Sequence, residues 1–178
     1  MAMPEKKSDV QALLDRLPEP AGGKMPPVEA ELMSEVIETL VEGAPERVGD
    51  LIGDVREVDN GGDWKARLAL NALMVQAGAP GRDGWRRRLA EACFRELAGK
   101  HPAAVKTFVL SQLRFIVGPE HVRELVPHLG SDDPQLADAA AAALVSVGKP
   151  ARRALDGALR GAKGRQRKVI ENALAQIG

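Results

Sequence analysis

The stretch that most constrains the fold is residues 133–148, DPQLADAAAAALVSVG, because weaker copies of its pattern recur along the chain. Asp133 and Pro134 predict a helix start, with the aspartate as the cap and the proline at the first helical position. The alanine-rich middle favours a helix, and Gly148 is typical of the left-handed residue that ends one. The same ending, a few mostly apolar residues and a glycine, recurs at Gly43, Gly78, Gly118 and Gly178. These five glycines lie 35, 40, 30 and 30 residues apart, a period that indicates stacked helical repeats.

Composition is consistent with a single domain built from thin helical layers. Apolar residues make up 44% of the 178 positions but aromatic residues only 3%, so the core has to consist of aliphatic side chains and alanine. Cys93 is the only cysteine, which excludes an internal disulfide and disfavours a secreted, disulfide-stapled scaffold. The first ten residues lack the apolar core of a signal peptide, and no apolar run reaches membrane-spanning length. We therefore expect a cytoplasmic protein that does not enter a membrane.

Charge is unevenly distributed although the net charge is zero. Residues 1–63 carry 6 basic and 15 acidic side chains, a net of −9, whereas residues 149–178 carry 8 basic and 2 acidic ones, a net of +6. In an elongated molecule the two ends would carry opposite charge. Such a dipole favours head-to-tail contacts between copies or the approach of a charged partner.

Residues 1–27 are predicted to form a separate N-terminal segment. Val10, Leu13, Leu14 and Leu17 have helical spacing after Ser8, a plausible cap, and the proline- and glycine-rich residues 18–27 indicate a connector. This short helix either folds back on the body or docks on another protein. We favour folding back or partial disorder, because isolated helices of this length are marginal in water.

Residues 28–178 are predicted to contain the repeats. Helix pairs begin near Val28, at Asp63 as a cap, at residues 101–102 and at Asp133, and residues 59–63, DNGGD, are interpreted as a joint between repeats. In the third unit the step from Pro102 to the glycine, Gly118, is 16 residues, two more than the 14 in the units on either side, which predicts an extra half turn or a bulge. Pro127 is expected to kink or shorten the second helix of this unit. Residues 163–178 predict a final helix whose polar face caps the stack. Its water-facing side chains are expected to be Arg165, Gln166, Glu171, Asn172 and Gln176.

The Asp-Pro opening, the alanine-rich helix and the SVG ending resemble the short bacterial HEAT-like repeats, including those of the phycobilisome-lyase type. The resemblance covers residues 63–178 best. In that family an arginine often precedes the glycine by eleven residues; Arg67 and Arg167 match, whereas Thr107 and Ala137 do not. The resemblance implies an all-α, right-handed α-solenoid of about four to five helix pairs, whose second helices line a concave face that most often binds proteins.

Residue patterns that would support catalysis are sparse. Cys93 lies on the apolar stripe of its helix, where a thiol is typical of core packing rather than of a nucleophile. His121, Glu124 and His128 share one helical face, but a closed metal site usually needs four ligands and Pro127 disturbs their spacing. HEAT-like hydroxylases carry several His-Glu pairs, and no histidine here is followed by glutamate. We therefore expect no catalytic residue, no metal and no cofactor.

Nucleic-acid binding is the main alternative, since basic residues accumulate toward the C-terminal half. They are Arg86, Arg87, Arg88, Arg123, Arg152, Arg153, Arg160, Lys163, Arg165, Arg167 and Lys168. HEAT-like DNA glycosylases resemble one another in a basic concave face with aromatic residues and a catalytic acid. This chain offers only Trp64 and Trp85, for which core packing is the favoured interpretation, and no distinctive acidic pocket. Phycobilin-lyase activity, raised only by the family name, is the least supported alternative.

The function that we expect is a non-catalytic protein-interaction scaffold. Its binding surface is predicted on the second helices, where Arg87, Arg123, Arg152 and Arg153 would meet acidic side chains of a partner protein. Because the acidic first unit and the basic last unit are complementary, self-association is a related expectation.

Overall fold

The structure, a computed structural model, describes residues 9–18, 30–42, 46–55 and 63–178. These residues form helices and turns without any strand, which confirms the all-α prediction. The α-helices are α1 (Asp9–Asp15), α2 (Ala30–Glu42), α3 (Glu46–Gly53), α4 (Trp64–Ala77), α5 (Asp83–Ala98), α6 (Ala103–Leu113), α7 (Val122–Leu125), α8 (Pro134–Val147), α9 (Arg152–Leu159) and α10 (Gly164–Ile177). Short 3-10 helices are η1 (Pro119–His121), η2 (Val126–Gly130) and η3 (Lys149–Ala151). In the described part of the chain, every helix is too short or too polar to cross a membrane.

Helix α8 begins and ends where the sequence predicts. The Asp133 carboxylate accepts hydrogen bonds from the backbone N–H groups of Gln135 at 2.8 Å and Leu136 at 3.2 Å, and Pro134 is the first helical residue. Gly148 follows the last turn with a φ of 75°, a conformation that disfavours any side chain. The predicted side-chain cap of α4 is not formed. The Asp63 side chain makes no capping hydrogen bond and instead accepts a hydrogen bond from Arg67 Nε at 2.7 Å.

The recurring glycines share a sequence position but not a conformation. Gly78 is helical, with φ −71° and ψ −14°, and Gly118 is extended, with φ −130° and ψ −174°. A Cβ atom on Gly78 would lie 2.6 Å from the backbone oxygen of Phe115. Gly78 is therefore suited to the close approach of the turn after α6. Gly148 has the predicted positive φ, but its ψ of −145° lies outside the left-handed helical region. Gly43 lies outside the described residues.

The third unit departs from the predicted helix lengths. The expected extra half turn or bulge in its first helix is wrong, since α6 has 11 residues whereas α4 and α8 have 14. The additional residues form a turn, in which Phe115 N–H bonds to the oxygen of Gln112 and Ile116 N–H to that of Leu113. The predicted effect of Pro127 is confirmed, because α7 has only 4 residues and continues as the 3-10 helix η2.

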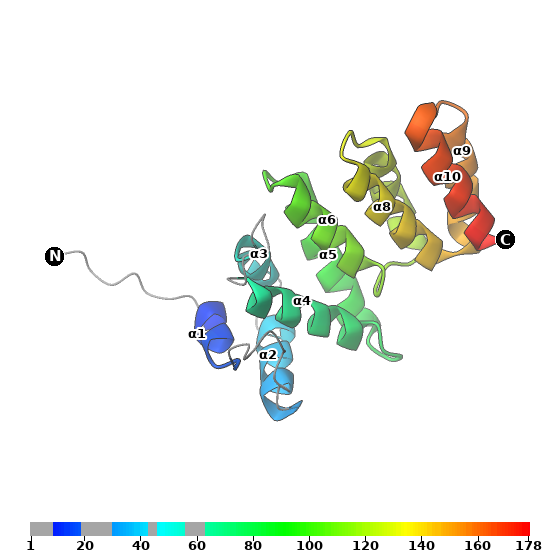
Figure 1. The fold of residues 1–178 in the computed structure, drawn as a ribbon. Helices are drawn as coiled ribbons and strands as arrows, with labels where there is room; N and C mark the ends of the chain where they lie inside the picture. Colours follow the sequence, from blue (N-terminus) through cyan, green and yellow to red (C-terminus); the bar gives the residue numbers. More distant parts are fainter. Residues whose placement is uncertain (1–8, 19–29, 43–45, 56–62) are drawn as a thin grey trace.

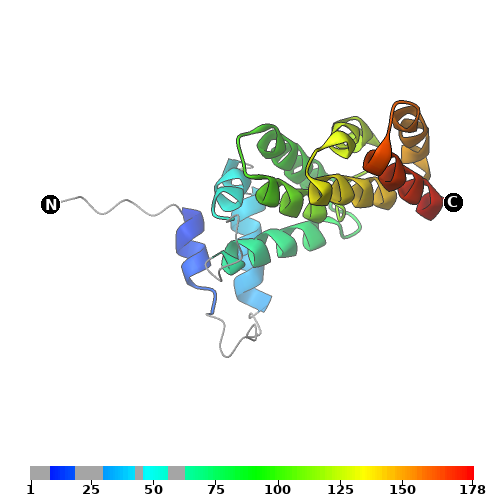
Figure 2. The ribbon, with the colours of Figure 1, turned by 45° about the horizontal axis from the view of Figure 1, so that its top comes forward.

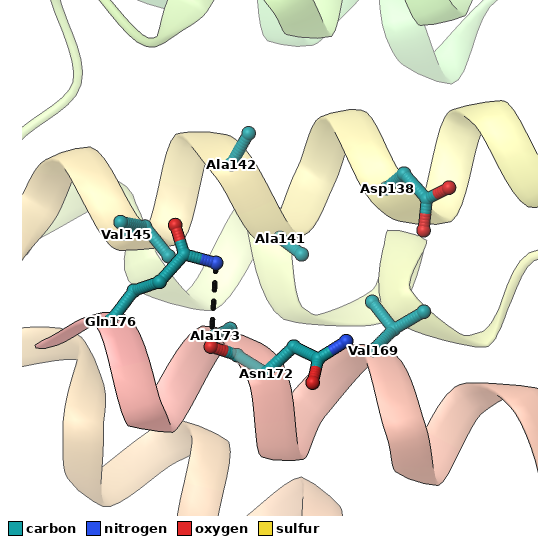
Figure 3. Close-up of a pocket in the computed structure, with 8 residues that line it drawn as sticks. All are labelled: Asp138, Ala141, Ala142, Val145, Val169, Asn172, Ala173 and Gln176. Carbon is teal, nitrogen blue, oxygen red and sulfur yellow. Dashed lines mark hydrogen bonds between the residues drawn. The ribbon is translucent and has the colours of Figure 1, made fainter.

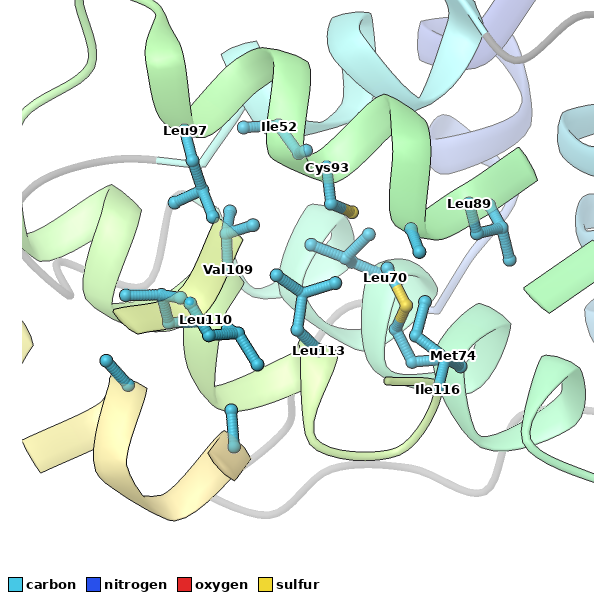
Figure 4. Packing of buried hydrophobic residues seen from close by; sticks show 14 of the residues in the cluster. Ile52, Leu70, Met74, Leu89, Cys93, Leu97, Val109, Leu110, Leu113 and Ile116 are labelled. Carbon is cyan, nitrogen blue, oxygen red and sulfur yellow. The ribbon is translucent and has the colours of Figure 1, made fainter. Parts of the chain in front are cut away.

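Helices α4 to α10 pack in successive layers. Helix α4 contacts α5 and α6, α6 contacts α8, and α10 contacts both α8 and α9. In Figures 1 and 2, α6, α8 and α10 lie side by side, and α9 lies against α10. Their buried faces form one aliphatic core, in which Leu70 and Met74 of α4 meet Leu113 of α6 (Figure 4). The core thus consists mainly of leucine, valine, isoleucine and alanine, as the composition predicts, with Met74 and Cys93 among them.

Helix α1 folds back on the body. It contacts α3 and α4, and Val10, Leu14 and Leu17 are buried in the same hydrophobic cluster as the later helices. Arg16 adds an exposed ion pair at 2.5 Å to Glu35 of α2. Folding back, one of the favoured alternatives, is therefore confirmed for this helix. Ser8, most of the predicted connector and most of the DNGGD joint lie outside the described residues.

Candidate interaction surface

The four arginines predicted to form a binding surface lie on α5, α7 and α9, which the sequence predicts as the second helices of their pairs. Arg87 is on α5, Arg123 on α7, and Arg152 and Arg153 are on α9. All four are exposed. Among the residues that the structure describes, none of these guanidinium groups lies within ion-pair distance of a carboxylate. Their charge is therefore available to a partner. We call these residues the second-helix arginines.

Several other basic residues are engaged within the molecule. Arg165 of α10 pairs with Asp138 of α8 at 2.7 Å, and Arg167 pairs with Glu171 on its own helix at 2.8 Å. Arg86 pairs with Asp83 at the start of α5. The basic residues that the sequence groups together thus divide into paired cations and available ones, and the second-helix arginines belong to the available group.

Arg67 and Arg167 occupy the same position relative to the repeat glycine but have different surroundings. Arg67 binds the buried carboxylate of Asp63, and its guanidinium carbon lies 4.6 Å from the centre of the Phe108 ring on α6. It therefore joins the start of α4 to the next layer. Among the ion pairs and ring contacts of the described residues, Arg167 takes part only in the ion pair with Glu171.

Cys93 is a core residue, as predicted. Its side chain is buried in α5 with no exposed surface. Burial, together with the nearby carboxylate of Glu96, raises the pKa of the Cys93 thiol to about 12. Because the thiolate is the nucleophilic form, this cysteine is not activated for covalent chemistry.

The histidines and Glu124 do not converge on a common centre. His121 is 6% exposed, its Nδ1 accepts a hydrogen bond from the Gly118 N–H at 3.0 Å, and its ring stacks on Phe94 at 5.5 Å between centres. Glu124 is exposed, whereas His128 is half-buried. Burial and the nearby charge of Lys106 lower the pKa of His128. In the described part of the chain, no three histidine, cysteine or acidic side chains are grouped closely enough to hold a metal ion.

Both tryptophans are half-buried and pack against the hydrophobic core, as predicted. The Trp64 ring lies 5.8 Å from Lys65 Nζ, and the Trp85 ring lies 4.1 Å from the guanidinium carbon of Arg82. Their positions at the beginnings of α4 and α5 separate them from Arg123, Arg152 and Arg153 along the fold. They thus do not supply an aromatic platform among the later second-helix arginines.

A shallow groove between α8 and α10 is a feature that the sequence analysis missed. It encloses about 210 Å³ between Asp138, Ala141, Ala142 and Val145 of α8 and Val169, Asn172, Ala173 and Gln176 of α10 (Figure 3). Gln176 bends back and its Nε2 donates to the backbone oxygen of Asn172 at 3.3 Å. Asn172 and Gln176 are exposed as predicted, and so are Arg165 and Glu171, whereas Gln166 is half-buried. Small alanines facing one another across two helices are the only sequence signal for this groove.

The chain matches no protein-family model, and comparison with curated proteins gave no match either. The resemblance to HEAT-like repeats therefore remains a prediction that depends on the residues themselves.

Proposed function

We propose that this protein is a non-catalytic cytoplasmic scaffold that binds the acidic surface of another protein. In this proposal α4 to α10 belong to a right-handed α-solenoid of HEAT-like helix pairs, and α5, α7 and α9 line its concave binding face. The order of helix contacts supports the solenoid, because α4, α6, α8 and α10 follow one another and α5 and α9 each accompany one of them. Contacts of α2 with α4 and of α3 with α5 extend the same alternation toward the N-terminus.

The observation that carries the proposal is that the second-helix arginines are exposed and have no ion-pair partner among the described residues. A guanidinium group binds a carboxylate through two parallel N–H donors, which gives strength and orientation that a lysine does not offer. Arginines spaced over three successive second helices would therefore select a partner whose carboxylates are spread along an extended surface. Exposed charges of this kind contribute mainly to the rate and specificity of association.

The absence of a catalytic role is part of the proposal, and the environments of Cys93 and His121 support it. Cys93 is fully buried with a raised thiol pKa. The Nδ1 atom of His121 is occupied by the Gly118 N–H, and its ring is stacked on Phe94. Both side chains thus have structural contacts that account for their positions.

Charge reversal tests the proposed surface. The variants Arg87→Glu/Arg123→Glu and Arg152→Glu/Arg153→Glu each change the net charge by about −4. A matched control is Lys100→Glu/Arg114→Glu, which makes the same change at exposed residues beside α5 and α6. Proteins captured from cell extract by the wild type and by the control should be lost with both test variants. Capture of the same proteins by all four forms would contradict the proposed surface.

The same variants distinguish a protein partner from nucleic acid, the alternative suggested by the basic residues. Binding of a labelled DNA duplex is measured at low and moderate salt, because release of counterions makes phosphate binding fall steeply with salt. The protein-partner proposal predicts no duplex binding that depends on the second-helix arginines. Salt-sensitive duplex binding that the test variants abolish would favour the nucleic-acid alternative instead.

A further inference from the structure

The two ends of the molecule carry opposite charge, and each presents it on an exposed helix. The described residues of α1, α2 and α3 with their adjoining turns, 9–18, 30–42 and 46–55, include nine acidic and two basic side chains. Residues 149–178, which contain α9 and α10, include eight basic and two acidic ones. Figure 1 places α2 and α10 far apart, at opposite ends of the succession of helices. One molecule therefore cannot neutralise its own ends.

The acidic end is organised as a stripe on α2. Glu31, Glu35 and Glu38 are exposed and follow the helical spacing that puts them on one side. Glu35 accepts a hydrogen bond from Arg16, which lowers the pKa of this carboxyl group. Neither Glu31 nor Glu38 makes an ion pair with any residue that the structure describes. We call these three residues the acidic α2 stripe.

The basic end surrounds the turn from α9 to α10. Arg160 and Lys163 lie in this turn and Lys168 lies on α10, and all three are exposed. Among the described residues, none of them has an ion-pair partner. The inner side of α10 packs on α8 and α9 through Ile170 and Ala173, and no described helix covers its outer side. We call Arg160, Lys163 and Lys168 the basic α10 patch.

We propose that a second copy of this chain docks its acidic α2 stripe on the basic α10 patch. Glu31 and Glu38 are separated by about 10 Å along their helix at about 1.5 Å per residue, and Lys163 directly precedes α10, which carries Lys168. The stripe offers exposed carboxylates and the patch offers exposed cations, so the two surfaces are complementary in charge. The contact joins different faces, so each copy keeps one free acidic and one free basic end, and association extends head to tail.

This contact does not depend on the proposed scaffold function. It uses none of the second-helix arginines, and its variants leave Arg87, Arg123, Arg152 and Arg153 unchanged. Failure of self-association and failure of partner capture are therefore separate results.

The test measures molar mass by light scattering as a function of protein and salt concentration. At low ionic strength we expect the mass to rise with concentration above the 19.0 kDa of one chain. Near 1 M salt we expect 19.0 kDa, because the screening length falls from about 10 Å at 0.1 M to about 3 Å. The variants Glu31→Lys/Glu38→Lys and Lys163→Glu/Lys168→Glu should each weaken association at least about tenfold.

Mixing the two variants supplies the decisive comparison. In each variant alone the α2 stripe and the α10 patch carry like charges, but together the two variants offer a stripe and a patch of opposite charge, so the mixture should regain salt-sensitive association. Circular dichroism checks that both variants fold, and the regained association confirms it independently. A single-chain mass at every concentration and salt would overturn the proposal. So would association that neither variant weakens, or a mixture that stays dissociated.

Discussion

Replacement of Gly78 by alanine tests whether close approach of the layers, rather than a left-handed turn, requires glycine there. The φ of −71° and ψ of −14° are ordinary for alanine, so the backbone conformation itself is no obstacle. The new Cβ would lie 2.6 Å from the backbone oxygen of Phe115 and 3.3 Å from that of Met74. Because the first distance is well below van der Waals contact and the obstacle is backbone, the turn after α6 has to move.

The expected loss follows from two opposing contributions. Overpacking of a tightly packed site costs about 1–3 kcal/mol, and a backbone obstacle places this position at the upper end. Alanine regains about 0.5–1 kcal/mol through its lower entropy in the unfolded chain. We therefore expect Gly78→Ala to lower the free energy of unfolding by about 2 kcal/mol. For a chain of this length that is a decrease in Tm of about 4–8 °C.

Substitutions at two control glycines separate the effect of the steric contact at Gly78 from the effect of backbone conformation. Gly157 lies exposed inside α9 with nothing within 4 Å of its added Cβ, so Gly157→Ala should stabilise by about 0.5–1 kcal/mol. Gly148 has equally open surroundings but a φ of 75°, so Gly148→Ala should destabilise by about 1–3 kcal/mol through backbone strain. Urea unfolding followed by far-UV circular dichroism measures all three. If Gly78→Ala were as stable as the wild type, the close-approach explanation would be refuted.

Three further predictions concern the cap of α8, the buried thiol of Cys93 and the half-buried imidazole of His128. Asp133→Ala should reduce the free energy of unfolding by about 0.5–2 kcal/mol in the same urea assay, because two backbone N–H groups lose their acceptor; an unchanged midpoint would contradict this role. The Cys93 thiol should resist labelling near pH 8 until denaturant is added, and stability should decrease as pH rises from 9.0 toward about 12, since the unfolded chain ionises first. Labelling of the native protein at the rate of the unfolded one would show that the thiol is accessible. Burial and Lys106 lower the pKa of His128 below 6.5, so stability should decrease as pH falls through 6.5, and His128→Gln should flatten that dependence in pH-resolved melting curves. Equal slopes for the variant and the wild type would refute the assignment.

Local signals predict the helix boundaries well where the physical cause is itself local. The Asp-Pro start of α8 and the shortening at Pro127 depend on capping and on a missing backbone donor, and both effects act within one turn. The periodic apolar residues also identify the buried faces, as Val48, Leu51 and Ile52 of α3 illustrate. These features need no knowledge of distant contacts.

The candidate surface was predictable only in part. The helical periodicity of the sequence places Arg87, Arg123, Arg152 and Arg153 on helices. It does not say which of the basic side chains are already neutralised by an ion pair within the molecule. The pairing of Arg165 with Asp138 joins residues 27 positions apart, and it arises only because α8 and α10 lie side by side. The groove between those helices likewise depends on how two faces meet, so the sequence pattern of α8 alone gives no indication of its shape.

By itself, the sequence determined an all-helical chain, its aliphatic core, the start and end of α8, and the opposite charge of its two ends. Only the tertiary structure decided that α6 ends at Leu113, that Gly78 accommodates the Phe115 carbonyl, and that Asp63 binds Arg67 instead of capping α4. The physical reason is the range of the forces involved. Capping, propensity and periodicity act over a few residues, whereas close approach and ion pairing depend on side chains and backbone that distant segments bring together.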